Sequence, residues 1–269
     1  MHETMNVVDA TPEFIDVAGR RVRHVILRGS GDAVILVHGI CGNLGVWAMN
    51  HAALAAGGRT VAAVDLPGHG ESSKQVASGA LEEMSSAVLD YMDAIGVEHA
   101  HLVGHSMGGT VCLDVVRREP TRVRSLALLG PSGIGPASNL PWVERLINAR
   151  SPAELMQVLR ESVGDPDLIN VEIAEDVLRY LRLEGATSAL TRIMDGVFRN
   201  PSADTGLCEA VGRVRTLVLW GGKDSVNPPP DAAAFVGDNV EFHLLPQYGH
   251  QLPLEAVAEV NRLIDGFLG

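Results

Sequence analysis

The chain has 269 residues, of which 46% are hydrophobic and 20% are charged, and its formal net charge is -12 at pH 7. This composition is typical of a folded globular protein with one large domain or two small ones, and it excludes a disordered chain. The acidic balance argues against nucleic acids and anionic membranes as partners, because both bind through basic surfaces.

The sequence shows no sign of export or of covalent cross-linking. Its first residues contain acidic side chains and lack the apolar core of a signal peptide, and no stretch reaches the roughly 18 unbroken apolar residues of a membrane helix. Cys41, Cys112 and Cys208 are scattered and form no C-x-x-C pair. We therefore expect small buried cysteines, no disulfide or zinc site, and a cytoplasmic protein.

The apolar pattern predicts strands that alternate with helices. Polar and apolar residues alternate at Phe14–Val17 and Arg21–Leu27, which predicts an antiparallel hairpin. Continuous apolar runs, typical of strands buried on both faces, follow at Ala33–Val37, Val61–Val64, His101–Val103, Val123–Leu129, Val214–Trp220 and Val240–Leu245. Helical spacing occurs at Trp47–Ala56, Leu81–Ile95, Met107–Arg118, Asp231–Val236 and Leu254–Leu268. This alternation predicts an α/β fold with a mostly parallel central sheet and helices on both faces.

One long region, between Leu129 and Val214, carries helix signals only. Ser151 to Glu154 reads as a capping box with a proline at the first helical position, and Asn170 precedes the periodic run VEIAEDVLRYLRL. A further helix is predicted at Ala186–Phe198. We therefore predict a core of residues 1–130 and 212–269, with a helical cap inserted at 131–211. A separate helical domain is the less favoured alternative, because strand signals resume directly after this region.

Ser106 lies in the run LVGHSMGGT, where a predicted strand meets a predicted helix. A turn this sharp accepts only very small neighbours, and Gly104 and Gly108 occupy those positions. It would expose the serine hydroxyl at a helix N-terminus, where unpaired N–H groups favour an oxyanion. The alternative is a glycine-rich helix start with a passive serine.

Two further candidates follow predicted strands, at the edge of the sheet where parallel α/β proteins bind their ligands. Asp224 comes after the strand that ends at Trp220, and His250 comes after the last strand. The order Ser, Asp, His is that of catalytic triads on this type of fold. Asp224 could instead cap a helix, with Asp231 and Asp238 as alternative acids, and His250 could be a surface loop residue.

The turn after Ala33–Val37 completes the predicted site. It contains His38 and Gly39, and backbone N–H groups in such a turn can stabilise a developing oxyanion. We expect the main-chain N–H groups of Ile40 and Met107 to form this oxyanion hole. Apolar side chains are compatible with that role because only the backbone takes part.

Five segments together resemble the α/β-hydrolase superfamily, and in particular its serine carboxylesterases. They are VHGICG (37–42), DLPGHGES (65–72), GHSMGG (104–109), WGGKDSVNPP (220–229) and GHQLPLE (249–255). The predicted cap is similar to that of the hydrolase associated with acetoin dehydrogenase operons. We expect no acyltransferase activity, because no lipoyl-type domain precedes the region. The resemblance implies an α/β-hydrolase fold in which Asp65 and His69 are structural or lie near the rim of the pocket and are not catalytic.

The predicted activity is hydrolysis of a small, largely apolar carboxylic ester or lactone through an acyl-enzyme, without metal or organic cofactor. Three alternatives remain open: a C–C bond hydrolase of ring-cleavage products, a cofactor-free perhydrolase, and a non-catalytic ligand receptor. The C–C hydrolases typically carry Asn before the serine and Trp after the histidine, where this chain has His105 and Gln251. This difference argues against the first alternative. The expected partner is a small-molecule ester, and a homodimer is left open. The candidate pocket residues are His38, His105, Trp142, Met156, Met194, Phe198 and Gln251.

Overall fold

The computed structural model describes residues 11–199, 206–235 and 237–269. An eight-stranded sheet in the order β1-β2-β4-β3-β5-β6-β7-β8 forms its centre. The strands are β1 Glu13–Val17, β2 Arg20–Leu27, β3 Ala33–Val37, β4 Thr60–Val64, β5 Ala100–His105, β6 Val123–Leu129, β7 Arg215–Gly221 and β8 Val240–Leu245. Each predicted strand is therefore confirmed to within a few residues.

The pairing of the strands agrees with the predicted mixture of one hairpin and a parallel sheet. β1 pairs with β2 and β2 with β4 in antiparallel register, whereas the strands from β3 to β8 run parallel to one another. β3 lies between β4 and β5, and the chain passes from β3 to β4 on one side but from β5 to β6 on the other. Loops that leave the carboxyl ends of β3 and β5 therefore diverge, and ligands bind at such a point.

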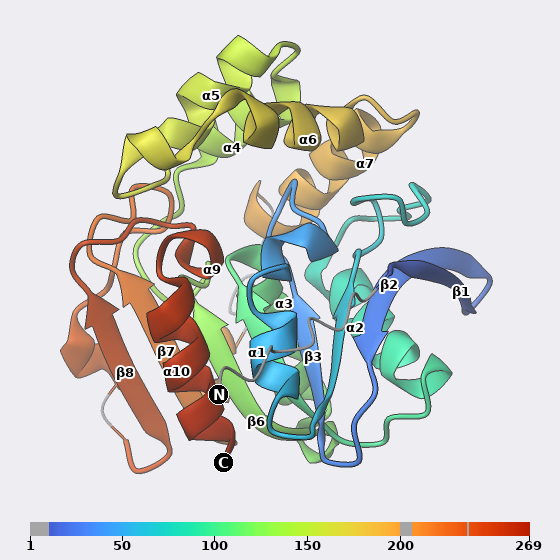
Figure 1. The fold of residues 1–269 in the computed structure, drawn as a ribbon, viewed down its shortest axis with the longest axis vertical. Helices are drawn as coiled ribbons and strands as arrows, with labels where there is room; N and C mark the ends of the chain where they lie inside the picture. Colours follow the sequence, from blue (N-terminus) through green and yellow to red (C-terminus); the bar gives the residue numbers. More distant parts are fainter. Residues whose placement is uncertain (1–10, 200–205, 236) are drawn as a thin grey trace, which may run out of the picture.

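Helices cover both faces of the sheet (Figure 1). In β3, Ile35 and Val37 pack into the hydrophobic cluster that includes α2 and α3, whereas Val34 and Leu36 pack into the cluster on the side of α1 and α10. This alternation is the reason that the strand reads as a continuous apolar run. The covering helices are α1 His51–Ala55, α2 Leu81–Ala94, α3 Met107–Arg118, α9 Leu252–Glu255 and α10 Val257–Leu268.

Three predicted helices differ in extent from the observed ones. The helix predicted at Trp47–Ala56 is a 3-10 helix, Leu44–Trp47, followed by α1. The helix predicted at Leu254–Leu268 is divided into α9 and α10 by the non-helical backbone of Ala256. The helix predicted at Asp231–Val236 is a 3-10 turn, Ala232–Phe235, and its last predicted residue lies outside the described residues. Three prolines, 228–230, lie one residue before this turn, and they cannot donate backbone hydrogen bonds.

The region between β6 and β7 forms a helical layer over the carboxyl ends of the strands (Figure 1). The predicted helix starts are confirmed: the Ser151 hydroxyl accepts a hydrogen bond from the Glu154 N–H, and the Asn170 side chain accepts one from the Ile173 N–H. The elements of this region are α4 Leu140–Asn148, α5 Pro152–Arg160, a 3-10 helix Pro166–Leu168, α6 Val171–Leu181, α7 Ala186–Ile193, a π-helix Met194–Arg199 and α8 Leu207–Ala210.

The expectation of three buried cysteines is wrong for one of them. Cys41 and Cys112 are buried, but Cys208 is exposed because it lies on the outer side of the short helix α8. Within the described ranges, no helix is long and apolar enough to cross a membrane. The same residues contain no group of three or more His, Cys, Asp or Glu side chains that could hold a metal ion.

Candidate active site

Ser106 lies in a strained turn between β5 and α3. Its φ of 55° and ψ of -125° are unusual for a residue with a side chain. A β-carbon on Gly104 would lie 2.5 Å from the Gly108 carbonyl oxygen, and one on Gly108 would lie 2.2 Å from the Val37 carbonyl oxygen. The glycines on both sides of the serine are therefore required by backbone contact, as the sequence predicts.

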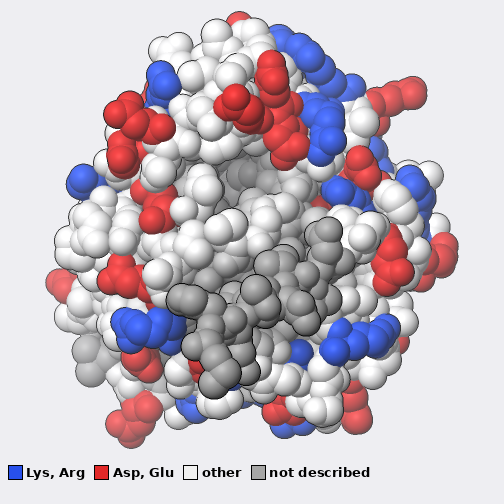
Figure 2. All heavy atoms as spheres, viewed as in Figure 1, with Lys and Arg blue, Asp and Glu red and all other residues white. Residues whose placement is uncertain are grey.

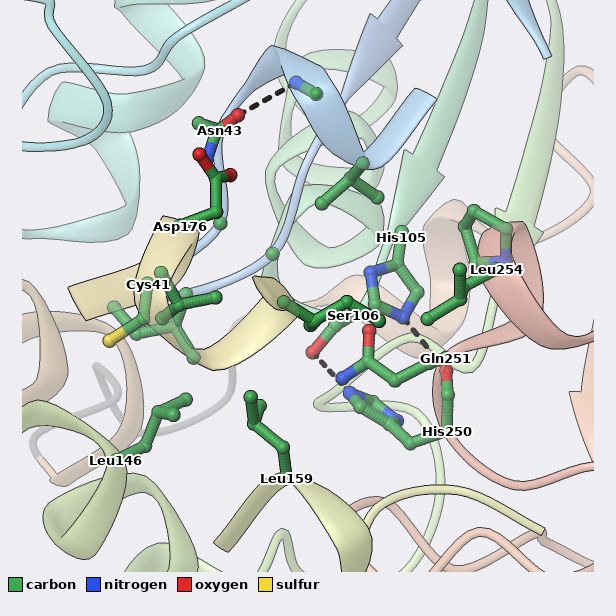
Figure 3. Close-up of a pocket in the computed structure, with 18 of the residues that line it drawn as sticks. Cys41, Asn43, His105, Ser106, Leu146, Leu159, Asp176, His250, Gln251 and Leu254 are labelled. Carbon is green, nitrogen blue, oxygen red and sulfur yellow. Dashed lines mark hydrogen bonds between the residues drawn. The ribbon is translucent and has the colours of Figure 1, made fainter. Parts of the chain in front are cut away.

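The side chains of Ser106, Asp224 and His250 form one hydrogen-bonded chain. The Ser106 Oγ lies 2.9 Å from the His250 Nε2, and the His250 Nδ1 lies 2.8 Å from the Asp224 Oδ2. Figure 3 shows the serine and the histidine side by side at the wall of a cavity. All three residues are buried, and they follow β5, β7 and β8.

The orientation of the Asp224 carboxylate is fixed by the backbone of its own loop. Its Oδ1 accepts hydrogen bonds from the N–H groups of Val226 and Asn227, at 2.9 and 2.8 Å, which leaves Oδ2 for the histidine. A carboxylate can only accept, so the neutral imidazole donates from Nδ1 and presents a lone pair at Nε2 to the serine hydroxyl. Asp231 and Asp238, the two alternative acids, are both exposed, and neither contacts the histidine.

The turn that follows β3 lies directly against the serine. A β-carbon on Gly39 would be 2.8 Å from the Ser106 Cβ, so only glycine fits there. The backbone N–H groups of Ile40 and Met107 have no hydrogen-bond partner within the described part of the chain. Two unpaired N–H groups beside a serine hydroxyl form the arrangement expected of an oxyanion hole.

The buried His38 ring makes hydrogen bonds on both sides that hold this turn in place. Its Nδ1 lies 2.8 Å from the Gly39 carbonyl oxygen, and its Nε2 accepts a hydrogen bond from the Leu66 N–H at 3.1 Å. Burial lowers the pKa of His38, which keeps the ring neutral. Asp65, expected to be structural, accepts hydrogen bonds from the N–H groups of Leu44 and Glu71.

A cavity of about 450 Å³ opens from Ser106 and His250 toward the cap. Apolar side chains from the 44–49 segment, the cap and α9 line it, including Val46, Leu146 and Leu254. Figure 2 shows a hollow below the cap helices that is bordered mainly by uncharged atoms. Among the described residues that line the cavity there is no lysine or arginine, and the only carboxylates are those of Glu172 and Asp176 on α6.

Three of the seven candidate pocket residues line this cavity: His105, Trp142 and Gln251. The other four do not. His38 is buried beneath the Gly39 turn, as described above. Met156 and Met194 pack into the hydrophobic core, and Phe198 borders a different cavity beside α3. A helical pattern identifies the buried face of a cap helix, but it does not tell which buried residues face the serine.

The cavity-lining residues that the sequence analysis did not predict include four on α6. Ile173 and Val177 line the cavity one helical turn apart, and Glu172 and Asp176 lie beside them. The Asp176 carboxylate accepts a hydrogen bond from the Arg179 guanidinium at 2.9 Å. The amphipathic spacing of this helix was visible in the sequence, but its position over the serine depends on how the cap packs.

His105 precedes the serine and contacts the histidine loop. Its Nε2 lies 2.8 Å from the His250 carbonyl oxygen, so the Nε2–H donates to it and Nδ1 carries the lone pair. Burial, assisted by the nearby His250, lowers the pKa of His105 to about 3. The ring is therefore neutral at physiological pH and acts as a hydrogen-bond donor to the backbone.

The fold and the serine turn define the class of this protein. A family model described as alpha/beta hydrolase fold matches residues 32–155. The structure resembles that of a meta-cleavage product hydrolase from Pseudomonas fluorescens IP01 with a TM-score of 0.82 and 22% sequence identity, over 95% of this chain and 97% of that one. The chain belongs to the α/β-hydrolase fold family.

Among curated proteins, the chain is similar to relatives with two kinds of name. It is 38% identical over 258 residues to the dihydrolipoyllysine-residue acetyltransferase component of the acetoin cleaving system of Pseudomonas putida. The matched region covers 96% of this chain and 69% of that protein. It is 28% identical over 260 residues to the 2-hydroxy-6-oxo-6-phenylhexa-2,4-dienoate hydrolase of Burkholderia cepacia, over 91% and 90% of the two chains.

Proposed function

We propose that the protein hydrolyses an uncharged, largely apolar carboxylic ester or lactone, with Ser106 as nucleophile, His250 as general base and Asp224 as its partner. The observation that carries this proposal is the 2.9 Å contact between the Ser106 Oγ and the His250 Nε2 at the floor of an apolar cavity. A serine becomes a useful nucleophile only when such a base accepts its proton.

The reaction has two halves. The Ser106 Oγ attacks the ester carbonyl carbon while its proton moves to the His250 Nε2, and the tetrahedral intermediate then expels the alcohol, which takes that proton. A water next attacks the acyl-enzyme, gives a proton to the same nitrogen, and releases the carboxylic acid as the serine regains its proton. Asp224 stabilises the imidazolium that forms in each half.

The oxyanion of each tetrahedral intermediate would be held by the N–H groups of Ile40 and Met107. Neither group has to leave another partner when the negative charge develops, because neither is hydrogen-bonded beforehand in the described structure. One such donor contributes roughly 3–4 kcal/mol to transition-state stabilisation in comparable sites.

The charge of the cavity favours an uncharged substrate over an anionic one. An anion placed between the apolar walls would lose hydration, and no cationic side chain among the described lining residues would compensate for it. Glu172 and Asp176 would add repulsion. This observation weighs against hydrolysis of a dienoate, the substrate in the name of the relative that is 28% identical, because a dienoate carries a carboxylate.

The test combines labelling of the serine with a substrate panel. Purified protein is treated with a fluorophosphonate probe and assayed with p-nitrophenyl butyrate, a lactone and a vinylogous diketone acid. We expect labelling and rapid ester hydrolysis by the wild type, and Ser106→Ala should abolish both while the melting temperature stays the same. Turnover of the diketone acid with little ester hydrolysis would favour the C–C hydrolase, and absence of labelling would favour a non-catalytic receptor.

A further inference from the structure

The loop that carries His250 is held by a side chain with no place in the proposed triad. Glu255 ends α9, and its carboxylate accepts hydrogen bonds from the Gln251 N–H at 2.8 Å and the Gly249 N–H at 2.9 Å. The amide between these two, that of His250, donates to the Ser162 carbonyl oxygen at 2.6 Å. Three consecutive amides around the histidine are therefore all fixed.

The same carboxylate also reaches the cap. The Glu255 Oε2 that accepts from Gly249 accepts a second hydrogen bond, at 2.6 Å, from the N–H of Gly164, which lies between α5 and the 3-10 helix Pro166–Leu168. One side chain thus joins the histidine loop of the core to a segment of the cap.

The cap segment and the histidine loop are in direct backbone contact. A β-carbon on Gly249 would lie 2.6 Å from the Ser162 carbonyl oxygen, and one on Gly164 would lie 2.3 Å from the Gln247 carbonyl oxygen. Both glycines are therefore required by the approach of the two segments. Ser162 is itself fully buried, and its hydroxyl donates to the Leu159 carbonyl oxygen at 2.7 Å, which ties the segment back to α5.

We propose that Glu255 is a positioning residue for the general base, which sets the place of His250 by holding its backbone against cap residues 162–164. The His105 ring donates a hydrogen bond to the carbonyl oxygen of His250, and Glu255 and Ser162 accept hydrogen bonds from the N–H groups of residues 249–251. The backbone that carries the imidazole is therefore held on both sides. A displacement of about 1 Å between reacting groups costs up to about a hundredfold in rate. This inference rests on the proposed role of His250 in activating Ser106.

The chain contains a matched control for this carboxylate. Glu83, on α2, accepts hydrogen bonds from the consecutive N–H groups of Ala77, Ser78 and Gly79, each at 2.9 Å. Its loop carries no residue of the proposed site. Glu255→Gln and Glu83→Gln each replace one acceptor oxygen by an NH2 group that cannot accept, and each would leave at least one of the three backbone N–H groups without its acceptor.

The experiment measures the rate of fluorophosphonate labelling of Ser106, together with kcat and KM for p-nitrophenyl butyrate and the melting temperature. Glu255→Gln should slow labelling and lower kcat ten- to hundredfold, with KM within twofold of the wild type. Glu83→Gln should keep the labelling rate and kcat within twofold of the wild type, even if its melting temperature falls as far as that of Glu255→Gln. If Glu255 had a purely structural role, Glu255→Gln and Glu83→Gln would instead lose labelling rate and kcat to the same extent.

Labelling separates this inference from the proposed substrate, because the probe reports activation of the serine whatever ester the protein acts on. Glu255→Gln labelled at the wild-type rate would overturn the positioning role and leave the triad intact. A wild type that is not labelled would overturn both. If Glu255→Gln fails to fold, Gly164→Ala tests the same contact from the cap side, and unchanged labelling in a folded Gly164→Ala protein would contradict the proposal.

Discussion

Replacing Asp224 with asparagine is the most direct test of the proposed base, because the structure dictates how the new side chain must lie. The Oδ1 position accepts hydrogen bonds from the Val226 and Asn227 N–H groups. An asparagine would keep its carbonyl oxygen there and turn its NH2 group toward the His250 Nδ1. That nitrogen would then have to accept, which moves the imidazole proton to Nε2, facing Ser106.

The expected loss has two sources. A unit charge about 4 Å from the imidazolium, at an effective dielectric constant of about 20, contributes about 4 kcal/mol, which corresponds to roughly a thousandfold in rate. The reversed tautomer also removes the lone pair that accepts the serine proton. We therefore expect kcat for a p-nitrophenyl ester to fall by about 10³–10⁴, as for the corresponding change in other triads.

The assay is steady-state hydrolysis of p-nitrophenyl butyrate, with thermal unfolding measured on the same preparations. Asp224→Asn should keep its melting temperature, because the two backbone hydrogen bonds of its loop survive. Asp231→Asn is the matched control: this exposed aspartate caps the Ala233 N–H further along the loop and should leave kcat unchanged. A loss of less than tenfold in Asp224→Asn, or an equal loss in the control, would refute the assigned role.

Two further predictions concern pH and charge. Burial lowers the pKa values of His38, His69 and His105, so below pH 6.5 the unfolded chain binds protons that the folded one does not. The free energy of unfolding should then fall by up to about 4 kcal/mol per pH unit, about 1.4 for each histidine, and a flat profile in urea unfolding between pH 7 and 5 would contradict this. Asp176→Lys should raise kcat/KM for a monoanionic succinate ester several-fold relative to p-nitrophenyl butyrate, whereas Glu175→Lys, outside the cavity lining, should not change that ratio.

The sequence predicts the sheet and the serine turn well because both depend on local constraints. A strand buried on both faces must be apolar throughout, as in β3, and the turn at Ser106 accepts only glycine two residues before and two residues after the serine. Asp224 and His250 could be placed at the same edge because parallel strands end together. The hydrogen bond between Asp224 and His250 could not be predicted from the sequence, because it depends on how the two loops fold toward each other.

The cavity walls were harder to predict because they depend on packing between elements that are distant in the chain. Met156 and Met194 have the apolar character expected of a wall, yet they pack into the hydrophobic core, while Ile173 and Val177 occupy the wall instead. Helical spacing distinguishes a buried face from an exposed one. It does not distinguish burial against another helix from burial against a ligand.

The contacts of Glu255 link the helical layer between β6 and β7 to the loops of the proposed triad. Its carboxylate holds Gly164 of the cap and Gly249 of the histidine loop, and the Ser225 hydroxyl next to Asp224 donates to the Glu161 carbonyl oxygen. Loops that carry two of the three proposed catalytic side chains are thus hydrogen-bonded to residues 161–164. Substrate access that requires this segment to move would disturb the base. We therefore expect entry to depend instead on α6, because within the described residues no hydrogen bond joins its Glu172 or Asp176 side chain to the triad loops.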